Sequence, residues 1–441
     1  MRLKPENRIS AFFAAMLAVI LLGACTENDQ AARQPIDLDT AAARYIELAL
    51  ALSLIDPHFV ASSYGEADLR EQALATPRSL QEISAAARDT ANDISASDAS
   101  EDLLDTARRA SLKAQLTSVA VRADLLEGRR LPFLEEAELV FGARVPELDA
   151  RAYILELHSK IDRIMPGQGL LVDRIDKFRR NFIIPRERLP AVIEAAVAEC
   201  RRRTYAAMEL PEERLEIEYA SGVNWLTFNE FRGNGFSVIK INTDLPVHID
   251  RALEMGCHEG YPGHHVSNVL KERELVEARG WKEYTVQTLF SPQTLVEEGA
   301  ASFAVELAFP PAEFVAFERD VLFDLAGFDR AQARRYFEMK RLLDELAYAD
   351  IEAARRYLDG EWDAEFTARW LINYRLLSPE RARQRLAVFD TYRTFIAAGY
   401  LGRRSVREYV DRHAADDGRA AAWQAYRDLL TRPVLPENLR N

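Results

Sequence analysis

The chain has 441 residues, of which 48% are hydrophobic and 29% are charged, so it can bury a large core in one large domain or in a few smaller ones. Its net charge of −13 and the absence of a long basic stripe exclude nucleic acid as an expected partner. Basic residues near the N-terminus precede an apolar run at 11–22 that is too short to span a membrane.

Residues 1–24 are therefore predicted to be a signal peptide. Small residues followed by Cys25 at the end of the apolar run are typical of a bacterial lipobox, in which the cysteine is acylated and becomes the new N-terminus. Ordinary signal cleavage nearby or an uncleaved anchor is the alternative. We expect a lipid on Cys25 to hold the protein to the membrane in the cell envelope, with the periplasmic face of the outer membrane favoured by Thr26.

The polar stretch 25–36 is predicted to be a tether, followed by one large helical domain over 37–435. Apolar residues recur at helical spacing through most of 37–210, while the Ala/Ser/Asp-rich segment 60–100 fits either weak helices or loops. The helices predicted in this first part are 38–54, 101–127, 131–142, 147–164, 167–182 and 187–208.

The pattern changes to alternation within 211–245, which predicts one small β-sheet. Its strands are 215–220, 225–228 and 236–242, with a Gly-Asn-Gly turn at 233–235. The sheet could offer a strand edge to an extended peptide, or it could only support the helix that follows. Asn242 at the end of the last strand is a candidate for binding substrate backbone, and a turn or capping role is the alternative.

Helical periodicity returns over 246–435, so the fold class is mainly α with the small sheet directly before a helix at 247–261. The other helices predicted here are 281–308, 311–325, 330–358, 363–377, 379–398, 404–415 and 418–431.

The helix at 247–261 leads into the motif Cys-His-Glu-Gly-Tyr-Pro-Gly-His-His at 257–265. Four of the seven histidines fall within 248–265, and Glu259 lies beside His258. Imidazoles crowded against a carboxylate suit a zinc site with a built-in base. The usual H-E-x-x-H pattern fails, because Pro262 occupies the position of its second histidine. A helix that breaks after Tyr261 could instead bring His264 or His265 back toward His258.

A third ligand has to come from elsewhere in the chain, and Glu297 and Glu298 are the candidates. They lie in an apolar segment followed by Gly299, Ala300 and Ala301, which would let this helix approach a neighbour closely. A carboxylate on such a face is costly to bury unless it is paired or bound to a metal. Exposure of one glutamate and ion pairing of the other is the structural alternative. Cys200 and Cys257 could form a disulfide in an oxidising envelope.

These motifs resemble the bacterial "domain of unknown function 885" family, whose members are mostly helical, are often lipoproteins and are related to the gluzincin metallopeptidases. The stretch 258–265 matches the family pattern H-E-x-x-P-G-H-H at each fixed position. Residues 298–303 match its second motif, E-G-W-A-L-Y, only in part, because Ala300 replaces the Trp and Ser302 the Leu, while Phe303 stands for the Tyr. The resemblance implies a mainly α, zincin-like domain.

Carried over by residue, the resemblance makes His258, His264 and Glu298 the ligands of one zinc ion per chain, with His265 in reserve for the second histidine. Glu259 becomes the general base that assists attack of water on a peptide substrate. Candidates for stabilising the oxyanion or binding substrate are Tyr392, Arg393 and Tyr400, for each of which simple packing is the alternative.

We therefore predict a lipid-anchored zinc metallopeptidase of the cell envelope. The alternatives are a non-catalytic helical lipoprotein with a vestigial metal site, and a zinc hydrolase of a non-peptide amide or ester.

Overall fold

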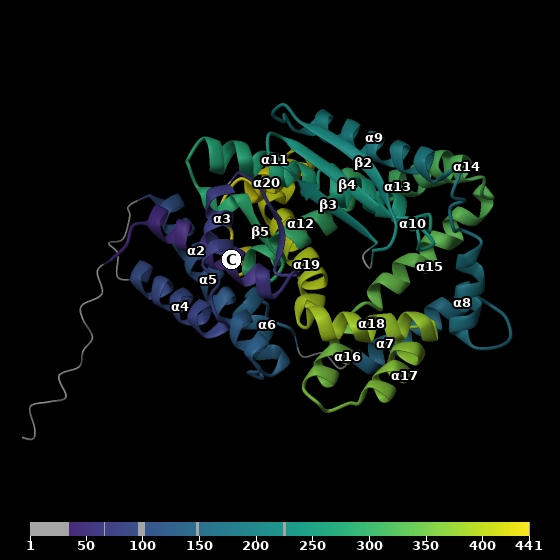
Figure 1. Cartoon of the computed structure of the whole chain (residues 1–441). Helices are drawn as coiled ribbons and strands as arrows, with labels where there is room; N and C mark the ends of the chain where they lie inside the picture. Colours follow the sequence, from purple (N-terminus) through teal and green to yellow (C-terminus); the bar gives the residue numbers. More distant parts are fainter. Residues whose placement is uncertain (1–34, 66, 96–101, 147–149, 224–225, 441) are drawn as a thin grey trace, which may run out of the picture.

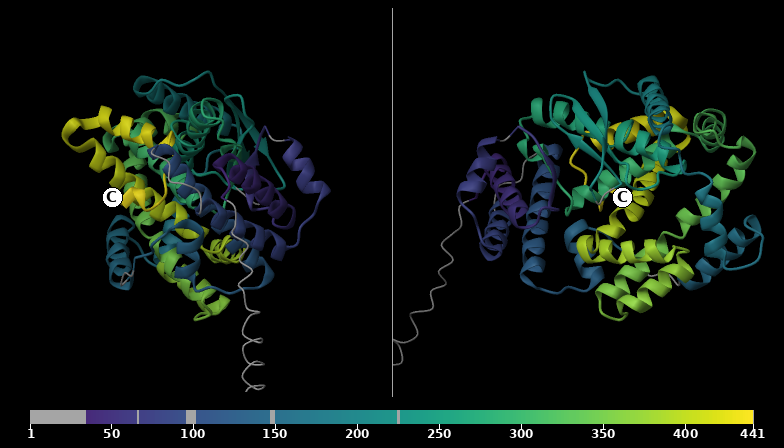
Figure 2. Two further views of the ribbon diagram at one scale, coloured as in Figure 1. Left: turned by 90° about the vertical axis from the view of Figure 1, so that its left-hand side faces the viewer. Right: turned by 45° about the vertical axis from the view of Figure 1, so that its right-hand side comes forward.

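The computed structural model describes residues 35–65, 67–95, 102–146, 150–223 and 226–440. The predicted signal peptide, the lipidation site Cys25 and most of the predicted tether lie outside the described residues. Within the described ranges the chain is mainly α-helical with two small sheets, which confirms the predicted fold class and adds one sheet to it. Figures 1 and 2 show the first helices of the chain, within residues 38–127, gathered on one side of the molecule, with α12 (Pro292–Ala308) and α19 (Phe395–Ala414) running through its middle.

The N-terminal part begins with α2, where the side chain of Asp37 accepts a hydrogen bond from the amide of Thr40 and caps the helix. The elements here are α2 (Leu38–Ile55), β1 (Val60–Ser63), α3 (Ala67–Ala75), α4 (Leu80–Ser95) and α5 (Leu103–Glu127). The segment 60–100, for which the sequence allowed either weak helices or loops, has one strand and two helices among its described residues. Strand β1 pairs antiparallel with β5 (Val286–Thr288), and strands this short carry no readable alternation, so the sequence did not predict this sheet.

The next helices are α6 (Phe133–Phe141), α7 (Ala150–Ile164), α8 (Leu171–Arg180) and α9 (Leu189–Ala207). Each matches a predicted helix to within a few residues. Pro190 lies in the first turn of α9, where its missing amide proton costs no helical hydrogen bond.

The predicted sheet forms from β2 (Arg214–Ala220), β3 (Thr227–Phe231) and β4 (Phe236–Asn242), in the order β2-β4-β3. Strand β4 pairs parallel with β2 and antiparallel with β3, so β2 and β3 are the edge strands. The tight turn between β3 and β4 uses positive φ at Gly233, Asn234 and Gly235, as the Gly-Asn-Gly signal predicted. Helix α9 runs beside this sheet in Figure 1.

After the sheet the chain is helical again, with irregular turns around the predicted motif. The elements are α10 (Asp250–Glu254), the π-helix η1 (Met255–Gly260), α11 (His264–Lys271), the π-helix η2 (Glu272–Glu277), the 3₁₀ turn η3 (Lys282–Thr285) and α12 (Pro292–Ala308). The predicted helix 281–308 is therefore wrong in its first third. Ser291 caps α12 through the amide of Thr294, and Pro292 follows at its first turn.

The C-terminal half consists of helices and short helical turns. They are α13 (Pro311–Phe317), η4 (Glu318–Leu322), α14 (Phe323–Ala326), η5 (Arg330–Gln332), α15 (Ala333–Glu345), α16 (Tyr348–Leu358), α17 (Ala364–Tyr374), α18 (Pro379–Tyr392), α19 (Phe395–Ala414), η6 (Ala415–Asp417), α20 (Gly418–Leu430) and η7 (Asn438–Arg440).

Two predicted boundaries in this half are wrong. The helix predicted at 330–358 is divided into α15 and α16 by a turn at 346–347. The sequence suggested helices at 379–398 and 404–415, with a break near Gly399 and Gly402. The break occurs instead at Arg393, where φ is +48°, and α19 continues through both glycines. Gly402 stays helical because it packs against another helix, as described below.

One large hydrophobic cluster includes buried residues from Ala41 in α2 to Leu439 in η7. A second, small cluster consists of Leu275, Trp281 and Tyr284. Among the described residues no single helix is long and apolar enough to cross a membrane. Helices Pro292–Ala308 and Pro311–Ala326 meet that criterion only when taken together, and they are bent by 81°.

Candidate metal centre

The helix that carries His258 changes its winding just before the motif ends. Helix α10 passes directly into the π-helix η1, in which the amide of Tyr261 donates to the carbonyl of Gly256 at 3.0 Å. Pro262 has no amide proton to continue the ladder, so the helix stops at this point. The chain turns through a cis Tyr261–Pro262 bond and starts α11 at His264, which confirms the predicted break after Tyr261.

The turn between the two histidines is too tight for any residue but glycine at position 263. The amide of Gly263 donates to the carbonyl of Cys257 at 2.9 Å. A Cβ at Gly263 would lie 1.9 Å from the carbonyl oxygen of His258 and 2.4 Å from that of Cys257. Gly263 therefore lets α11 begin directly against the end of η1.

This turn brings His264 back against His258. Their ring centroids are 4.7 Å apart and the rings are nearly perpendicular, at 81°. A straight helix would have placed the two side chains about 120° apart around its axis. The break in the helix thus brings together two histidines that are six positions apart in the sequence.

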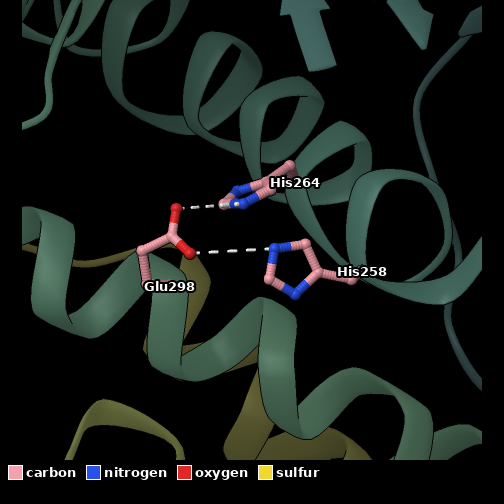
Figure 3. A group of neighbouring side chains, drawn as sticks. All are labelled: His258, His264 and Glu298. Atoms are coloured by element: carbon pink, nitrogen blue, oxygen red, sulfur yellow. Dashed lines mark ion pairs between the residues drawn. The ribbon is translucent and has the colours of Figure 1, made fainter. Parts of the chain in front are cut away.

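Glu298 faces this pair from α12. Its carboxylate oxygens lie 3.4 Å from Nε2 of His264 and 3.7 Å from Nε2 of His258. One ligand atom from each of the three residues fits within 4.8 Å of the others. Figure 3 shows the two rings and the carboxylate pointing toward one another from opposing helical segments.

The adjacent glutamate, Glu297, has a different partner. It forms an ion pair with Lys271 and accepts a hydrogen bond from Gln293 at 2.7 Å. Of the two candidate carboxylates, Glu298 is therefore the one directed at the histidines.

Helix α12 is held close to its neighbour α19 at the residue next to Glu298. A Cβ at Gly299 would lie 2.4 Å from the backbone of Gly402, and a Cβ at Gly402 would lie 2.2 Å from the carbonyl of Leu295. The sequence predicted that small residues here would allow a close helix approach, and this is confirmed. The crossing also explains why Gly402 does not end a helix.

The spacing of the three side chains fits a bound ion better than direct hydrogen bonds. Separations of 3.4 and 3.7 Å are longer than the roughly 2.7–2.9 Å of a charge-assisted hydrogen bond. Ligand atoms about 2.0–2.1 Å from a tetrahedral zinc ion would be about 3.3–3.4 Å apart. The group His258, His264 and Glu298 can thus hold a metal ion, and two nitrogens with one oxygen are donors that suit zinc.

Burial and mutual contact determine the protonation of these side chains. Burial, aided by the nearby His264, lowers the pKa of His258 to about 3, so its ring is neutral. Burial would raise the pKa of Glu298, but its contacts with the two histidines outweigh this and lower it to about 2. Burial would lower the pKa of His264, but Glu298 outweighs it and raises the pKa to about 9. A metal ion would compete with that proton.

Glu259 lies directly beside this group and is 6% exposed. Burial is the main reason that its pKa rises to about 7, and the charge of Glu298 adds to the effect while His264 opposes it. A carboxyl whose pKa lies near neutrality can both accept and return a proton at physiological pH. Its backbone carbonyl accepts a hydrogen bond from the amide of the Asn229 side chain in β3 at 2.8 Å.

The reserve ligand, His265, points away from the metal group. It is fully buried, with Nδ1 2.8 Å from the hydroxyl of Ser237 and Nε2 2.9 Å from the carboxylate of Glu213. Of the two histidines, His264 is therefore the one that lies with His258 and Glu298. Cys257 forms a disulfide with Cys200 of α9, which ties the residue before His258 to a neighbouring helix.

Four further residues were predicted as catalytic or substrate-binding candidates, and each makes contacts within the protein that can explain its position. The Asn242 side chain is buried and bonds the backbone of Val223 and Asp244. Arg393 makes an ion pair with Glu136 of α6. The ring of Tyr392 lies 5.3 Å from that of His58, and the ring of Tyr400 lies 5.9 Å from that of Tyr348. Their catalytic or substrate-binding roles stay predictions.

Sequence reasoning missed the buried polar side chains around the motif. Glu213, Tyr426 and Asn229 each bond to residues 259–265, yet they come from three distant parts of the chain. None belongs to a motif or an unusual pattern, so only the fold reveals them.

No protein-family model and no curated protein matches this chain, so the family resemblance stays a prediction. A solved structure of a putative lipoprotein from Colwellia psychrerythraea is similar, with a TM-score of 0.53 and 14% identity over 96% of this chain and 78% of that one. A putative lipoprotein of unknown function from Shewanella oneidensis aligns at 0.46 and 11% over 85% and 76%. Trypanosoma cruzi metallocarboxypeptidase 1 aligns at 0.46 and 13% over 89% of each chain.

At such low identity the likeness to the Colwellia protein shows the fold alone. The class that fold and site define is a mainly α-helical protein in which a small sheet packs beside a broken helix, with His258 before the break and His264 after it.

Proposed function

We propose that this protein is a zinc-dependent hydrolase that cleaves peptide bonds, with one zinc ion held by His258, His264 and Glu298. The convergence of these three side chains within 4.8 Å, beside a buried glutamate, is the observation that carries the proposal. The match of 258–265 to the pattern of the "domain of unknown function 885" family supports it further.

When bound, zinc would supply a Lewis acid that polarises a carbonyl and makes water more acidic. The residues of the chain would do the rest. The carboxylate of Glu259 would accept a proton from the attacking water and return it to the leaving amine, and its pKa of about 7 suits both steps. The neutral ring of His258 and the ionised carboxylate of Glu298 would hold the metal without first losing a proton.

The edge strand β3 supports a peptide over other carbonyl substrates. It ends the sheet on one side, and its Asn229 reaches the backbone of Glu259. Strand β3 therefore lies near the proposed base, and an extended peptide could pair with its edge as an added strand.

The Cys200–Cys257 disulfide supports a location in the envelope, because disulfides persist in oxidising compartments and are rare in the cytosol. We propose attachment through a lipid on Cys25, on the strength of the sequence around it.

The test is the zinc content of the protein purified without added metal or chelator, measured by mass spectrometry. We expect close to one zinc per chain, and its loss in His258→Ala and in Glu298→Ala. His413→Ala is the matched histidine control, because His413 is exposed and bonds only within its own helix. Glu306→Gln is the matched control on α12, because Glu306 pairs with Arg403 and Arg407.

Metal-loaded protein would then be tested on a panel of peptides, esters and non-peptide amides. Cleavage of peptides would support the proposal. Cleavage of esters or other amides alone would show that peptides are not the substrate. A wild-type chain that neither contains zinc nor takes it up on titration would refute it.

A further inference from the structure

The turn between His258 and His264 is held from two sides by buried polar side chains that the proposed chemistry does not use. Tyr426 reaches it from α20, and Glu213 reaches it from the start of the sheet. Neither side chain is among the candidate metal ligands.

Tyr426 joins the two segments that carry ligands. Its hydroxyl is 3.1 Å from the carbonyl oxygen of Pro262 in the turn and 3.1 Å from that of Ala300 in α12. The side chain is fully buried, and burial raises the pKa of its hydroxyl well above the usual range, so it remains a hydrogen-bond donor. One carbonyl lies two residues before His264 and the other two residues after Glu298. The single hydroxyl proton, shared between these two carbonyl oxygens, thus links the backbone before His264 to the backbone after Glu298.

Glu213 holds the residues on either side of the same turn. One of its carboxylate oxygens accepts a hydrogen bond from the hydroxyl of Tyr261 at 2.6 Å and lies 2.9 Å from Nε2 of His265. Its other oxygen is bonded by Tyr205 at 2.6 Å and Arg201 at 2.7 Å, both on α9. The Glu213 side chain has no exposed surface, so water does not compete for these bonds.

These contacts matter because a metal site has to keep its donor atoms within about 0.5 Å of the productive geometry. His264 starts α11 directly after a turn of three residues, so its position depends on where that turn is held. We propose that Tyr426 and Glu213 are positioning residues that fix this turn and thereby set the metal affinity of the site. The inference rests on the proposed metal site and names two residues that act on it through the backbone.

The test compares Tyr426→Phe with wild type in zinc affinity, measured by competition with a chromophoric chelator well below the unfolding temperature. We expect the dissociation constant to rise roughly tenfold, as is typical for loss of an outer partner of a metal ligand. Tyr348→Phe is the matched control, because Tyr348 is also buried and its hydroxyl donates to a backbone carbonyl, that of Pro146 at 2.9 Å. The control should lose stability but keep wild-type affinity.

Tyr261→Phe tests the Glu213 side, since it removes one hydrogen bond and leaves the ring in place. A similar rise in the dissociation constant is expected. Wild-type affinity in Tyr426→Phe, or an equal loss in Tyr348→Phe, would refute the role of Tyr426. Wild-type affinity in Tyr261→Phe would refute that of Glu213.

Hydrogen exchange of the metal-free protein separates this inference from the proposed function. We expect faster exchange at residues 263–267 in Tyr426→Phe than in wild type or in Tyr348→Phe. If wild type binds no zinc, the proposed function fails, while exchange still decides whether Tyr426 holds the turn. Unchanged exchange in this segment would overturn the inference in either case.

Discussion

Removing the Cys200–Cys257 disulfide should destabilise the protein and loosen its candidate metal centre. The two cysteines are 57 residues apart in sequence, and both are fully buried. Opening a loop of this length costs about 4 kcal/mol of stability in the chain-entropy account. For a chain of this size that corresponds to a fall of about 5 °C in the melting temperature. The double variant Cys200→Ala/Cys257→Ala is preferred to serines, because a buried hydroxyl would add its own cost.

The assay is equilibrium unfolding in guanidinium chloride of three samples: wild type, wild type with reductant, and the double variant. Reduced wild type and the double variant should show the same loss of about 4 kcal/mol. Zinc affinity should fall as well, because Cys257 directly precedes His258. A double variant within about 1 kcal/mol of oxidised wild type would refute the reasoning. Reactive thiols at both Cys200 and Cys257 in denatured, unreduced wild type would refute the disulfide itself.

Glu259→Gln should lower kcat by roughly 10²–10⁴ while the bound zinc is retained, and unchanged peptide hydrolysis would exclude the assigned base. Burial would raise the pKa of Glu213, but its hydrogen bonds lower it to about 2, below the ordinary 4.5. The ionised carboxylate therefore contributes about 3 kcal/mol to the free energy of unfolding above pH 4.5, and this contribution is lost as the pH falls toward 2. In urea unfolding between pH 6 and pH 3, the free energy of unfolding of Glu213→Gln should accordingly fall less than that of wild type. Gly299→Ala should cost about 1–3 kcal/mol, because its Cβ would collide with Gly402, whereas Ser302→Ala on the same helix should be close to neutral in thermal unfolding.

Much of the fold and of the candidate site could be predicted from the local chemistry of the sequence. Helical periodicity predicted the mainly α fold, and Gly-Asn-Gly predicted the tight turn between β3 and β4. Pro262 lacks an amide proton, so a break in the helix after Tyr261 could be predicted from local chemistry. The third ligand was predicted among the glutamates of 297–298, which precede a run of small residues. Small residues allow close helix packing, and α12 does pack closely against α19 at Gly299.

Only the tertiary structure decided which partners these local features meet. His264 and His265 are adjacent, and the bonds of His265 to Ser237 and Glu213 direct it away from the metal group. Glu297 and Glu298 are also adjacent, but Glu297 forms an ion pair with Lys271, whereas Glu298 faces His264. The helix break at Arg393 and the pairing of β1 with β5 likewise depend on contacts far along the chain. Such contacts arise from packing between distant segments, and no pattern over neighbouring residues encodes them.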